Sequence, residues 1–210
     1  PGIFKAFFLA GGPGSGKTFV TSSAFAGTGL KLVNSDNAFE RNLKKAGLSM
    51  KMPDEEEYFR NIIRQRAKTT AITQLETYLK GRLGLVIDST GRDYDLIARN
   101  VNMLKQIGYD CYMVFVNTSL EVALARNARR ERTIPEYITT SSWNGVQSNM
   151  GKFQRLFGMS NFLVVDNNKS DLELTTLTMN RVSKEVRKYM KTPIQSYIAK
   201  RWMASERKAK

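Results

Sequence analysis

A glycine-rich segment near the start of the chain has the residue types and spacing of a phosphate-binding loop. Four residues separate Gly11 from Gly16, and Lys17 and Thr18 follow directly. Glycines let backbone N–H groups converge on an anion, and a helix starting just beyond adds its positive end. The lysine would neutralise the β- and γ-phosphates of a nucleoside triphosphate, and the threonine hydroxyl would ligate Mg²⁺. The predicted loop comprises Gly11, Gly12, Pro13, Gly14, Ser15, Gly16, Lys17 and Thr18.

The context of this segment supports the same interpretation. An apolar run at 4–10 leads directly into it, and 18–25 has the composition of a helix. The alternative is a glycine-rich turn that arose by coincidence. The order of strand, loop, lysine, threonine and helix instead fits the P-loop (Walker A) pattern. We therefore expect ATP as the bound nucleotide, with GTP left open, and Mg²⁺ as the metal.

An acidic residue follows a weaker apolar run at 30–34. The chain has no histidine, so a carboxylate has to handle proton transfer near neutral pH. Asp36 is the predicted base that takes a proton from an acceptor hydroxyl. The alternative is that Asp36 caps a helix over 37–46.

A second acidic residue ends the apolar run at 83–88. Asp88 stands where a Walker-B-type carboxylate organises Mg²⁺ together with Thr18, although a loop in which Asp88 is only a cap is the alternative. Beyond it, Thr90 and Arg92 offer a hydroxyl and a cation to a substrate, and Gly91 allows close approach.

Four arginines fall within seven residues before Pro135. Guanidinium groups on such a segment can close over a site, exclude water and neutralise charge on a phosphoryl group in transfer. The alternative is a solvated helix end with cations at its C-terminus. The four are Arg126, Arg129, Arg130 and Arg132.

The elements that position these residues are short apolar runs that alternate with helical stretches. The runs are apolar on consecutive residues, as expected for parallel strands covered on both faces. They span 4–10, 30–34, 83–88, 111–117 and 162–166, with helices expected over 18–25, from Pro53 to Leu79, and over 93–107, 119–130 and 135–157. The pattern predicts an α/β doubly wound parallel sheet of about five strands with helices on both faces.

Two features of this outline carry further expectations. The long helix from Pro53 should bury an apolar face of Tyr58, Ile62, Ile63, Ala67, Leu75 and Leu79. After a helix over 171–190, Pro193 should break the chain and start a basic C-terminal helix. This division predicts a kinase domain over 1–190 and a basic helical tail over 191–210. The tail could bind nucleic acid or an acidic protein, or be a frayed, solvated end.

Composition narrows the class of protein. At 210 residues and a formal charge of +14, the chain suits one α/β domain whose partners are polyanions, although a basic surface can also serve solubility alone. Cys111 is the single cysteine, which excludes an internal disulfide, and its apolar surroundings indicate a core residue. No apolar run is long enough to span a bilayer. We expect a cytoplasmic protein with no membrane partner.

The motifs together resemble two kinase families over about 4–166. The P-loop, Asp36 and the run 85–92 are similar to zeta-toxin kinases, which phosphorylate a hydroxyl of a nucleotide sugar, while Arg126 and Arg130 resemble the lid of phage polynucleotide kinases. The resemblance implies a P-loop kinase-type fold, Lys17 and Thr18 at phosphate and metal, Asp36 as base, Thr90 and Arg92 near the substrate, and Arg126 and Arg130 as lid arginines.

Three positions depart from these families. Zeta toxins carry Glu at Asp88 and at Ile72, and polynucleotide kinases carry Arg at Phe39. We expect an ATP-dependent kinase with an alcohol group as acceptor, on a nucleotide sugar, another nucleotide or a polynucleotide. The alternative is a nucleotide-binding assembly or regulatory protein with little catalysis, which docks on a partner or DNA through its basic tail.

Overall fold

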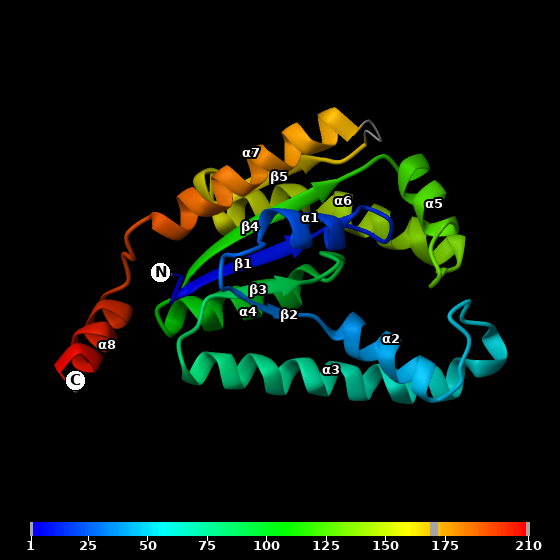
Figure 1. Cartoon of the computed structure of the whole chain (residues 1–210), viewed down its shortest axis with the longest axis horizontal. Coiled ribbons are helices and arrows are strands. Elements are labelled where there is room, and N and C mark those ends of the chain that lie inside the picture. The colour runs from blue at the N-terminus through cyan, green and yellow to red at the C-terminus, as the bar shows by residue number, and fades with distance from the viewer. Residues whose placement is uncertain (1, 169–171, 209–210) are drawn as a thin grey trace.

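The computed structural model describes residues 2–168 and 172–208 and contains a five-stranded parallel sheet with the order β2-β3-β1-β4-β5 (Figure 1). This is the predicted α/β architecture. The phosphate-binding loop follows the central strand, so that neighbouring strand ends surround it. The strands are β1 (Lys5–Ala10), β2 (Lys31–Val33), β3 (Leu85–Asp88), β4 (Asp110–Asn117) and β5 (Phe162–Asp166).

The helices have the predicted order along the chain, with bounds within a few residues of those expected. Figure 1 shows them distributed over both sides of the sheet. They are α1 (Lys17–Ala24), α2 (Ser35–Lys45), α3 (Glu57–Lys80), α4 (Tyr94–Gln106), α5 (Leu120–Ala128), α6 (Glu136–Phe157), α7 (Leu172–Lys191) and α8 (Tyr197–Lys208), with short 3₁₀ helices η1 (Asp54–Glu56) and η2 (Met159–Asn161). Asp171 and Lys210, which were expected in the last two helices, lie outside the described residues.

The central strand β1 is buried along its whole length, because each of its faces packs under helices. Phe7 and Leu9 contact α1 and α7, whereas Ala6 and Phe8 belong to the core beneath α4, α6 and the C-terminal half of α3. Lys5 is also buried, and its ammonium group lies 2.8 Å from a carboxylate oxygen of Asp110 at the start of β4. The strands are therefore apolar on consecutive residues because each face of the sheet packs against its own core.

A third, smaller core lies beyond the sheet, between α2 and the N-terminal half of α3. Phe39, Ile63 and Ala67 are buried there, and Ile134 from the loop before α6 packs on them. Tyr58 and Ile62 were expected on the buried face of α3, but they are exposed by 72% and 39%. The prediction was wrong for these two residues, because α3 reaches past the sheet, where α2 and nearby loops cover a narrow face of it, and it was right for Ile63 and Ala67.

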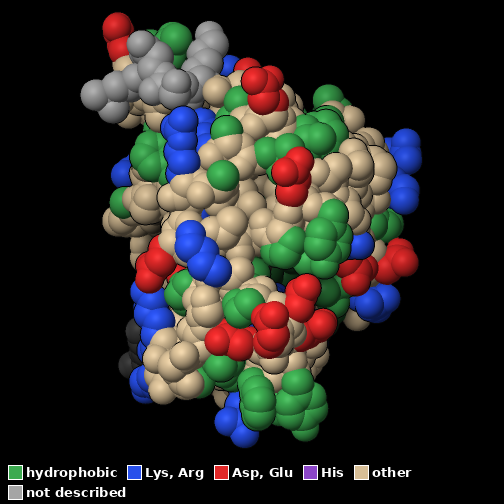
Figure 2. Space-filling view, turned by 90° about the vertical axis from the view of Figure 1, so that its right-hand side faces the viewer, with side chains coloured by type: hydrophobic (Ala, Val, Ile, Leu, Met, Phe, Trp, Pro, Cys, Tyr) green, Lys and Arg blue, Asp and Glu red, His purple; other side chains and the backbone are tan. Residues whose placement is uncertain are grey.

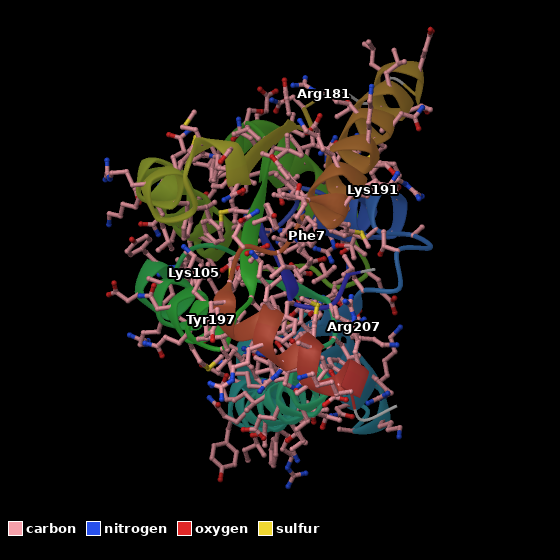
Figure 3. The ribbon with its side chains drawn as sticks, turned by 90° about the vertical axis from the view of Figure 1, so that its left-hand side faces the viewer. Phe7, Lys105, Arg181, Lys191, Tyr197 and Arg207 are labelled. Atoms are coloured by element: carbon pink, nitrogen blue, oxygen red, sulfur yellow. The ribbon has the colours of Figure 1, made fainter. Side chains whose placement is uncertain are left out.

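Helix α8 is attached to the core, at the end of the molecule where β1 begins (Figure 3). Ala199 is fully buried, and the Trp202 ring lies edge-on to Phe4 with 5.4 Å between ring centroids. The expectation of a frayed end was therefore wrong for this face of the helix, because its apolar residues close the core over β1. Within the described residues, no helix combines the length and apolarity needed to cross a membrane.

Candidate active site

A cavity of about 780 Å³ lies at the carboxyl ends of the strands, which is where ligands bind in sheets of this topology. Figure 2 shows this face of the molecule, on which acidic and basic side chains lie close together. Residues from the phosphate-binding loop, α2, α3, the loop after β3 and the loop between α5 and α6 line the cavity. The sequence placed candidate site residues in each of these segments except α3.

The phosphate-binding loop joins β1 to α1 and packs against α5 and against Asn167, which follows β5. Gly14 has a φ of +77°, and a Cβ on it would collide with the carbonyl oxygen of Ala123 in α5. Gly16 has a φ of +90°, and a Cβ there would collide with the side-chain amide of Asn167. This amide donates a hydrogen bond of 2.7 Å to the Ser15 carbonyl. Glycine is therefore required at these two positions by both conformation and space.

Two polar side chains of the loop, those of Lys17 and Thr18, line the cavity. The Lys17 ammonium group donates a 2.6 Å hydrogen bond to the Gly11 carbonyl, so the lysine folds back over the loop. Thr18 is exposed in the first turn of α1. The Ser15 hydroxyl is buried and, within the described residues, has no hydrogen-bond partner. The loop therefore contributes a cation and a hydroxyl, from Lys17 and Thr18, to the lining of the cavity.

Asp88 ends β3 beside this loop. One of its carboxylate oxygens accepts a 2.8 Å hydrogen bond from the Asn34 side chain, and the other is buried and has no partner among the described residues. Burial raises the pKa of Asp88, with Lys17 opposing this change and Asp36 adding to it. The alternative that Asp88 is only a cap is wrong, since Asp93 caps the following helix.

Asp36 lines the cavity from the first turn of α2. The side chain that caps this helix belongs to Asn34, which accepts a 2.6 Å hydrogen bond from the Asp36 amide. The alternative that Asp36 serves as the cap is therefore wrong. Its carboxylate is left free to interact across the cavity.

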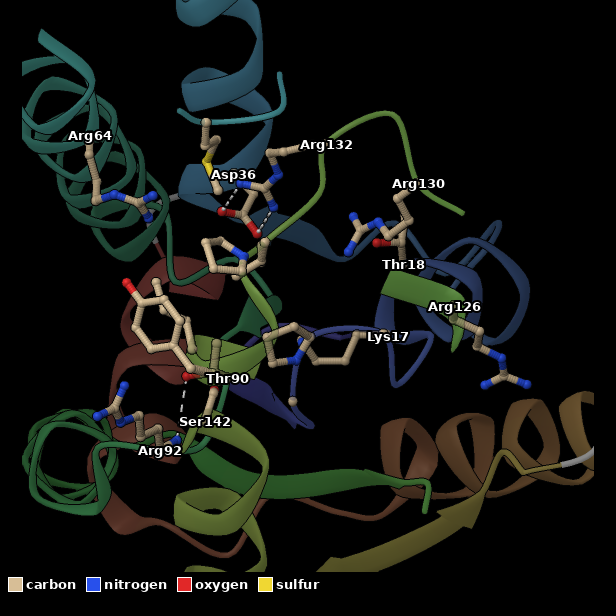
Figure 4. A pocket seen from close by; sticks show the side chains of 18 of the residues that line it. Lys17, Thr18, Asp36, Arg64, Thr90, Arg92, Arg126, Arg130, Arg132 and Ser142 are labelled. Atoms are coloured by element: carbon tan, nitrogen blue, oxygen red, sulfur yellow. Dashed lines mark hydrogen bonds and ion pairs between the residues drawn. The ribbon is translucent and has the colours of Figure 1, made fainter. Parts of the chain in front are cut away.

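That carboxylate binds Arg132, which the sequence had not singled out from the four arginines. The guanidinium group lies 3.2 Å and 3.3 Å from the two Asp36 oxygens and 2.9 Å from Glu40. Burial alone would raise the pKa of Asp36, but Arg132, with Lys17 and Arg64, outweighs it and lowers the pKa. Asp36 is thus an ionised carboxylate held in one orientation (Figure 4).

The predicted lid arginines are placed differently from each other. Arg130 lies on the side of the cavity that holds Lys17 and Thr18, whereas Arg126 is turned away from Asp36 (Figure 4). Arg126 donates a 2.7 Å hydrogen bond to the Asn167 carbonyl. Asn127 closes the loop, because its side chain bonds both the N–H and the carbonyl of Ile134.

Thr90 and Arg92 lie at the other end of the cavity, in the loop after β3. Asn149 of α6 fixes this loop by donating to the carbonyls of Gly91 and Arg92, at 3.2 Å and 2.8 Å. The Arg92 side chain crosses α6 at Gly145, where a Cβ would come within 3.0 Å of it. One cavity is therefore lined by Lys17, Thr18, Asp36, Asp88, Thr90, Arg92, Arg126 and Arg130, with the Arg126 side chain directed away from Asp36.

Comparison with protein-family models identifies a match to the AAA domain over residues 7–153. The chain belongs to this AAA domain family. The matched segment begins in β1 and ends in α6, so it contains the phosphate-binding loop, Asp36, Asp88 and the arginine-rich loop of this AAA domain protein. No curated protein matches the chain by sequence.

Solved structures share the fold of this AAA domain protein. A candidate kinase from Chloroflexus aurantiacus is 16% identical, with a TM-score of 0.59 over 90% of this chain and 96% of that one. AvrRxo1-ORF1:-ORF2 with ATP is 16% identical, with a TM-score of 0.59 over 85% of this chain and 63% of that one. The PezAT toxin-antitoxin system of Streptococcus pneumoniae is 15% identical, with a TM-score of 0.55 over 87% and 86%. The AAA domain protein therefore has a P-loop kinase-like fold.

Proposed function

We propose that this protein transfers the γ-phosphoryl group of ATP, or of GTP, to the hydroxyl of an acceptor. The observation that carries the proposal is the arrangement of one cavity, in which Lys17 and Thr18 of the phosphate-binding loop share the space with the ionised carboxylate of Asp36. Phosphoryl transfer needs a site for the donor phosphates and a carboxylate near the attacking oxygen.

The donor would lie along the loop of residues 11–18. Backbone N–H groups there would surround the β-phosphate, Lys17 would leave the Gly11 carbonyl to contact the β- and γ-phosphates, and the start of α1 adds its positive end. The AvrRxo1 structure with the same fold contains ATP, which supports a nucleoside triphosphate as donor.

The residues present suit Mg²⁺, which prefers oxygen ligands and keeps several waters. The Thr18 hydroxyl and the buried carboxylate oxygen of Asp88, which has no described partner, would hold the ion directly or through water. When bound, the metal supplies positive charge that stabilises the β- and γ-phosphate oxygens.

Asp36 would orient the acceptor hydroxyl and take its proton as the oxygen bonds to the γ-phosphorus and the bond to the β-phosphate oxygen breaks. Its lowered pKa makes it a weak base, so proton transfer would come late and orientation would dominate. Arg130, on the side of Thr18, would neutralise charge on the transferring group, and Arg126 would brace the lid through Asn167.

For the acceptor, we propose a nucleotide-derived or nucleic-acid hydroxyl, as in zeta-toxin and polynucleotide kinases. The PezAT structure of a toxin-antitoxin system has the same fold, and six arginines line the cavity beside four carboxylates, an excess of positive charge that suits a polyanion. We also propose that residues 191–210 take no direct part in catalysis, although α8 packs on the core, because α8 lies at the end of the sheet opposite the cavity.

The test is incubation of the protein and Mg²⁺ with ATP labelled at the γ-phosphate and a panel of acceptors. Nucleotide sugars, nucleosides, nucleotides and 5′-hydroxyl oligonucleotides form the panel, and label should move to one class. Binding of ATP without label on any acceptor would support the alternative, a nucleotide-binding assembly protein, and would overturn the proposal.

A further inference from the structure

Arg64 of α3 is a cation in the cavity that forms no ion pair with any residue that the structure describes. Its guanidinium carbon lies 4.4 Å from the centre of the Phe39 ring. Figure 4 shows the side chain extending from α3 toward the cavity on the side opposite Lys17 and Thr18. Stacking on the ring fixes the plane of the guanidinium and leaves its N–H groups available to a ligand.

The surroundings of Arg64 are positively charged. Burial lowers the pKa of Arg64, as do the neighbouring guanidinium groups of Arg132 and Arg60, and Asp36 opposes them. The carboxylates of Asp54 and Glu57 also line the cavity. The Asp36 carboxylate is already bound by Arg132 at 3.2 Å and 3.3 Å. The cations in this half of the cavity therefore repel one another, and an anionic ligand would relieve the repulsion.

Arg92 is a second cation in this half of the cavity. It comes from the loop after β3, and within the described residues its guanidinium also forms no ion pair. Figure 4 shows Arg64 and Arg92 on the same side of the cavity, away from the phosphate-binding loop. Each guanidinium group offers five N–H donors, a number that suits the several oxygens of a phosphate.

We propose that Arg64 and Arg92 bind a phosphate group that the acceptor carries in addition to its reacting hydroxyl. The acceptor would be a phosphorylated alcohol whose hydroxyl meets Asp36 while its own phosphate lies between α3 and the loop after β3. This inference rests on the proposed function and names the class of its acceptor.

The binding test uses inorganic phosphate as the probe, with the protein first loaded with Mg²⁺ and a non-hydrolysable ATP analogue so that the phosphate-binding loop is filled. Titration calorimetry on the wild type should detect phosphate binding, and Arg64→Gln and Arg92→Gln should each weaken it about tenfold or more, as expected for loss of charge-assisted hydrogen bonds. Arg66→Gln removes the same charge from an exposed position of the same helix and should bind phosphate as the wild type does.

Equal phosphate affinity in Arg64→Gln and the wild type would overturn the inference, as would tighter binding of acetate than of phosphate, which would indicate a carboxylate acceptor. Arg64→Lys keeps the charge but not the planar fork, and it should recover part of the lost affinity. Unfolding curves that match the wild type would show that a variant has lost phosphate affinity without a folding defect.

A kinetic readout separates this inference from the proposed function. Phosphorylated alcohols should gain label at least about tenfold more efficiently than the same alcohols without phosphate, and Arg64→Gln should raise their KM while kcat changes little. Equal labelling of both forms would overturn the phosphate site and leave phosphoryl transfer intact. If the wild type fails to bind the ATP analogue, the proposed function falls, and the assignment of an acceptor falls with it.

Discussion

Both terminal nitrogens of Arg132 lie on the carboxylate of Asp36, at 3.2 Å and 3.3 Å from its two oxygens. The arginine comes from the loop between α5 and α6, and its side chain is almost fully buried between α2 and that loop. Its Nε reaches Glu40, 2.9 Å away. This contact ties the segment over the cavity to the residue proposed to orient the acceptor. Any change that opens the segment would therefore also release Asp36.

Replacing Asp36 by Asn should separate binding from transfer. The amide keeps the size of the side chain but loses the negative charge that would orient the acceptor hydroxyl and take its proton, so transfer should fall by about 10²–10⁴-fold. Affinity for ATP with Mg²⁺ should change little, because the donor is held by the opposite side of the cavity. Single-turnover assays and calorimetry measure the two quantities. Unchanged turnover would remove Asp36 from the mechanism.

Replacing Arg132 by Gln should raise the pKa of Asp36, because the opposing effect of burial remains when the cation is lost. The acidic limb of the kcat/KM profile should then move to higher pH, whereas Arg129→Gln, an exposed change in the same loop, should leave it in place. A limb that does not move would show that Asp36 does not titrate in the profile.

The same substitution should reduce stability by about 1–3 kcal/mol at pH 7, since the carboxylates of Asp36 and Glu40 lose the guanidinium that they contact. The Asp36 pKa is lowered on folding, so its favourable contribution is present above the unfolded value and is lost as pH falls through the folded value. The difference in unfolding free energy between wild type and variant should therefore narrow from pH 7 toward pH 3, as urea titrations at several pH values would show.

The sequence alone predicts those parts of the fold and of the site whose signal lies within a few neighbouring residues. The spacing of Gly11, Gly16 and Lys17 defines the loop, and runs of consecutive apolar residues define buried strands, because both patterns act within a few residues. The pairing of Asp36 with Arg132 joins positions 96 residues apart, and no local rule predicts it. Arg64 was missed for the same reason, since its partner ring lies on α2.

The exposed Tyr58 and Ile62 show a different limit. Helical periodicity predicts that a face is buried only if something covers it, and coverage depends on where the sheet ends. In α3 the buried face at this level is narrow and includes Ile63 and Ala67. Placing α2 over that face required the tertiary structure.

Gly14→Ala should disable the loop. A Cβ would meet the Ala123 carbonyl at a φ of +77°, so the loop has to shift or strain, with an expected loss of stability above about 1 kcal/mol and much weaker ATP binding. Gly151→Ala is the matched control, because this helical glycine has open space around it and should gain about 0.5–1 kcal/mol. Urea titrations and calorimetry measure both. Normal ATP affinity in Gly14→Ala would contradict the described loop geometry.

Cys111 should be unreactive in the folded protein. Burial raises the pKa of this thiol to about 12, with Lys105 opposing and Asp110 adding to the effect. A thiol reagent at pH 8 should label the chain only after unfolding in urea. Because the folded pKa lies above the unfolded value of about 8.5, stability from this group is complete below that value and declines as pH rises toward 12, by at most about 1.4 kcal/mol per pH unit. Equal labelling rates in folded and unfolded protein would contradict the buried position.

Trp202→Ala tests whether α8 is part of the folded core. The ring packs edge-on against the fully buried Phe4, 5.4 Å away, so its removal should cost about 2–3 kcal/mol and lower the Tm by about 5–10 °C. Tyr197→Ala on the same helix removes a ring that is 75% exposed and should change stability by no more than about 0.5 kcal/mol. Phosphoryl transfer below the Tm should be normal in both variants, because α8 lies at the end of the sheet opposite the cavity. Equal melting temperatures for the two variants would mean that α8 does not pack on β1 in solution.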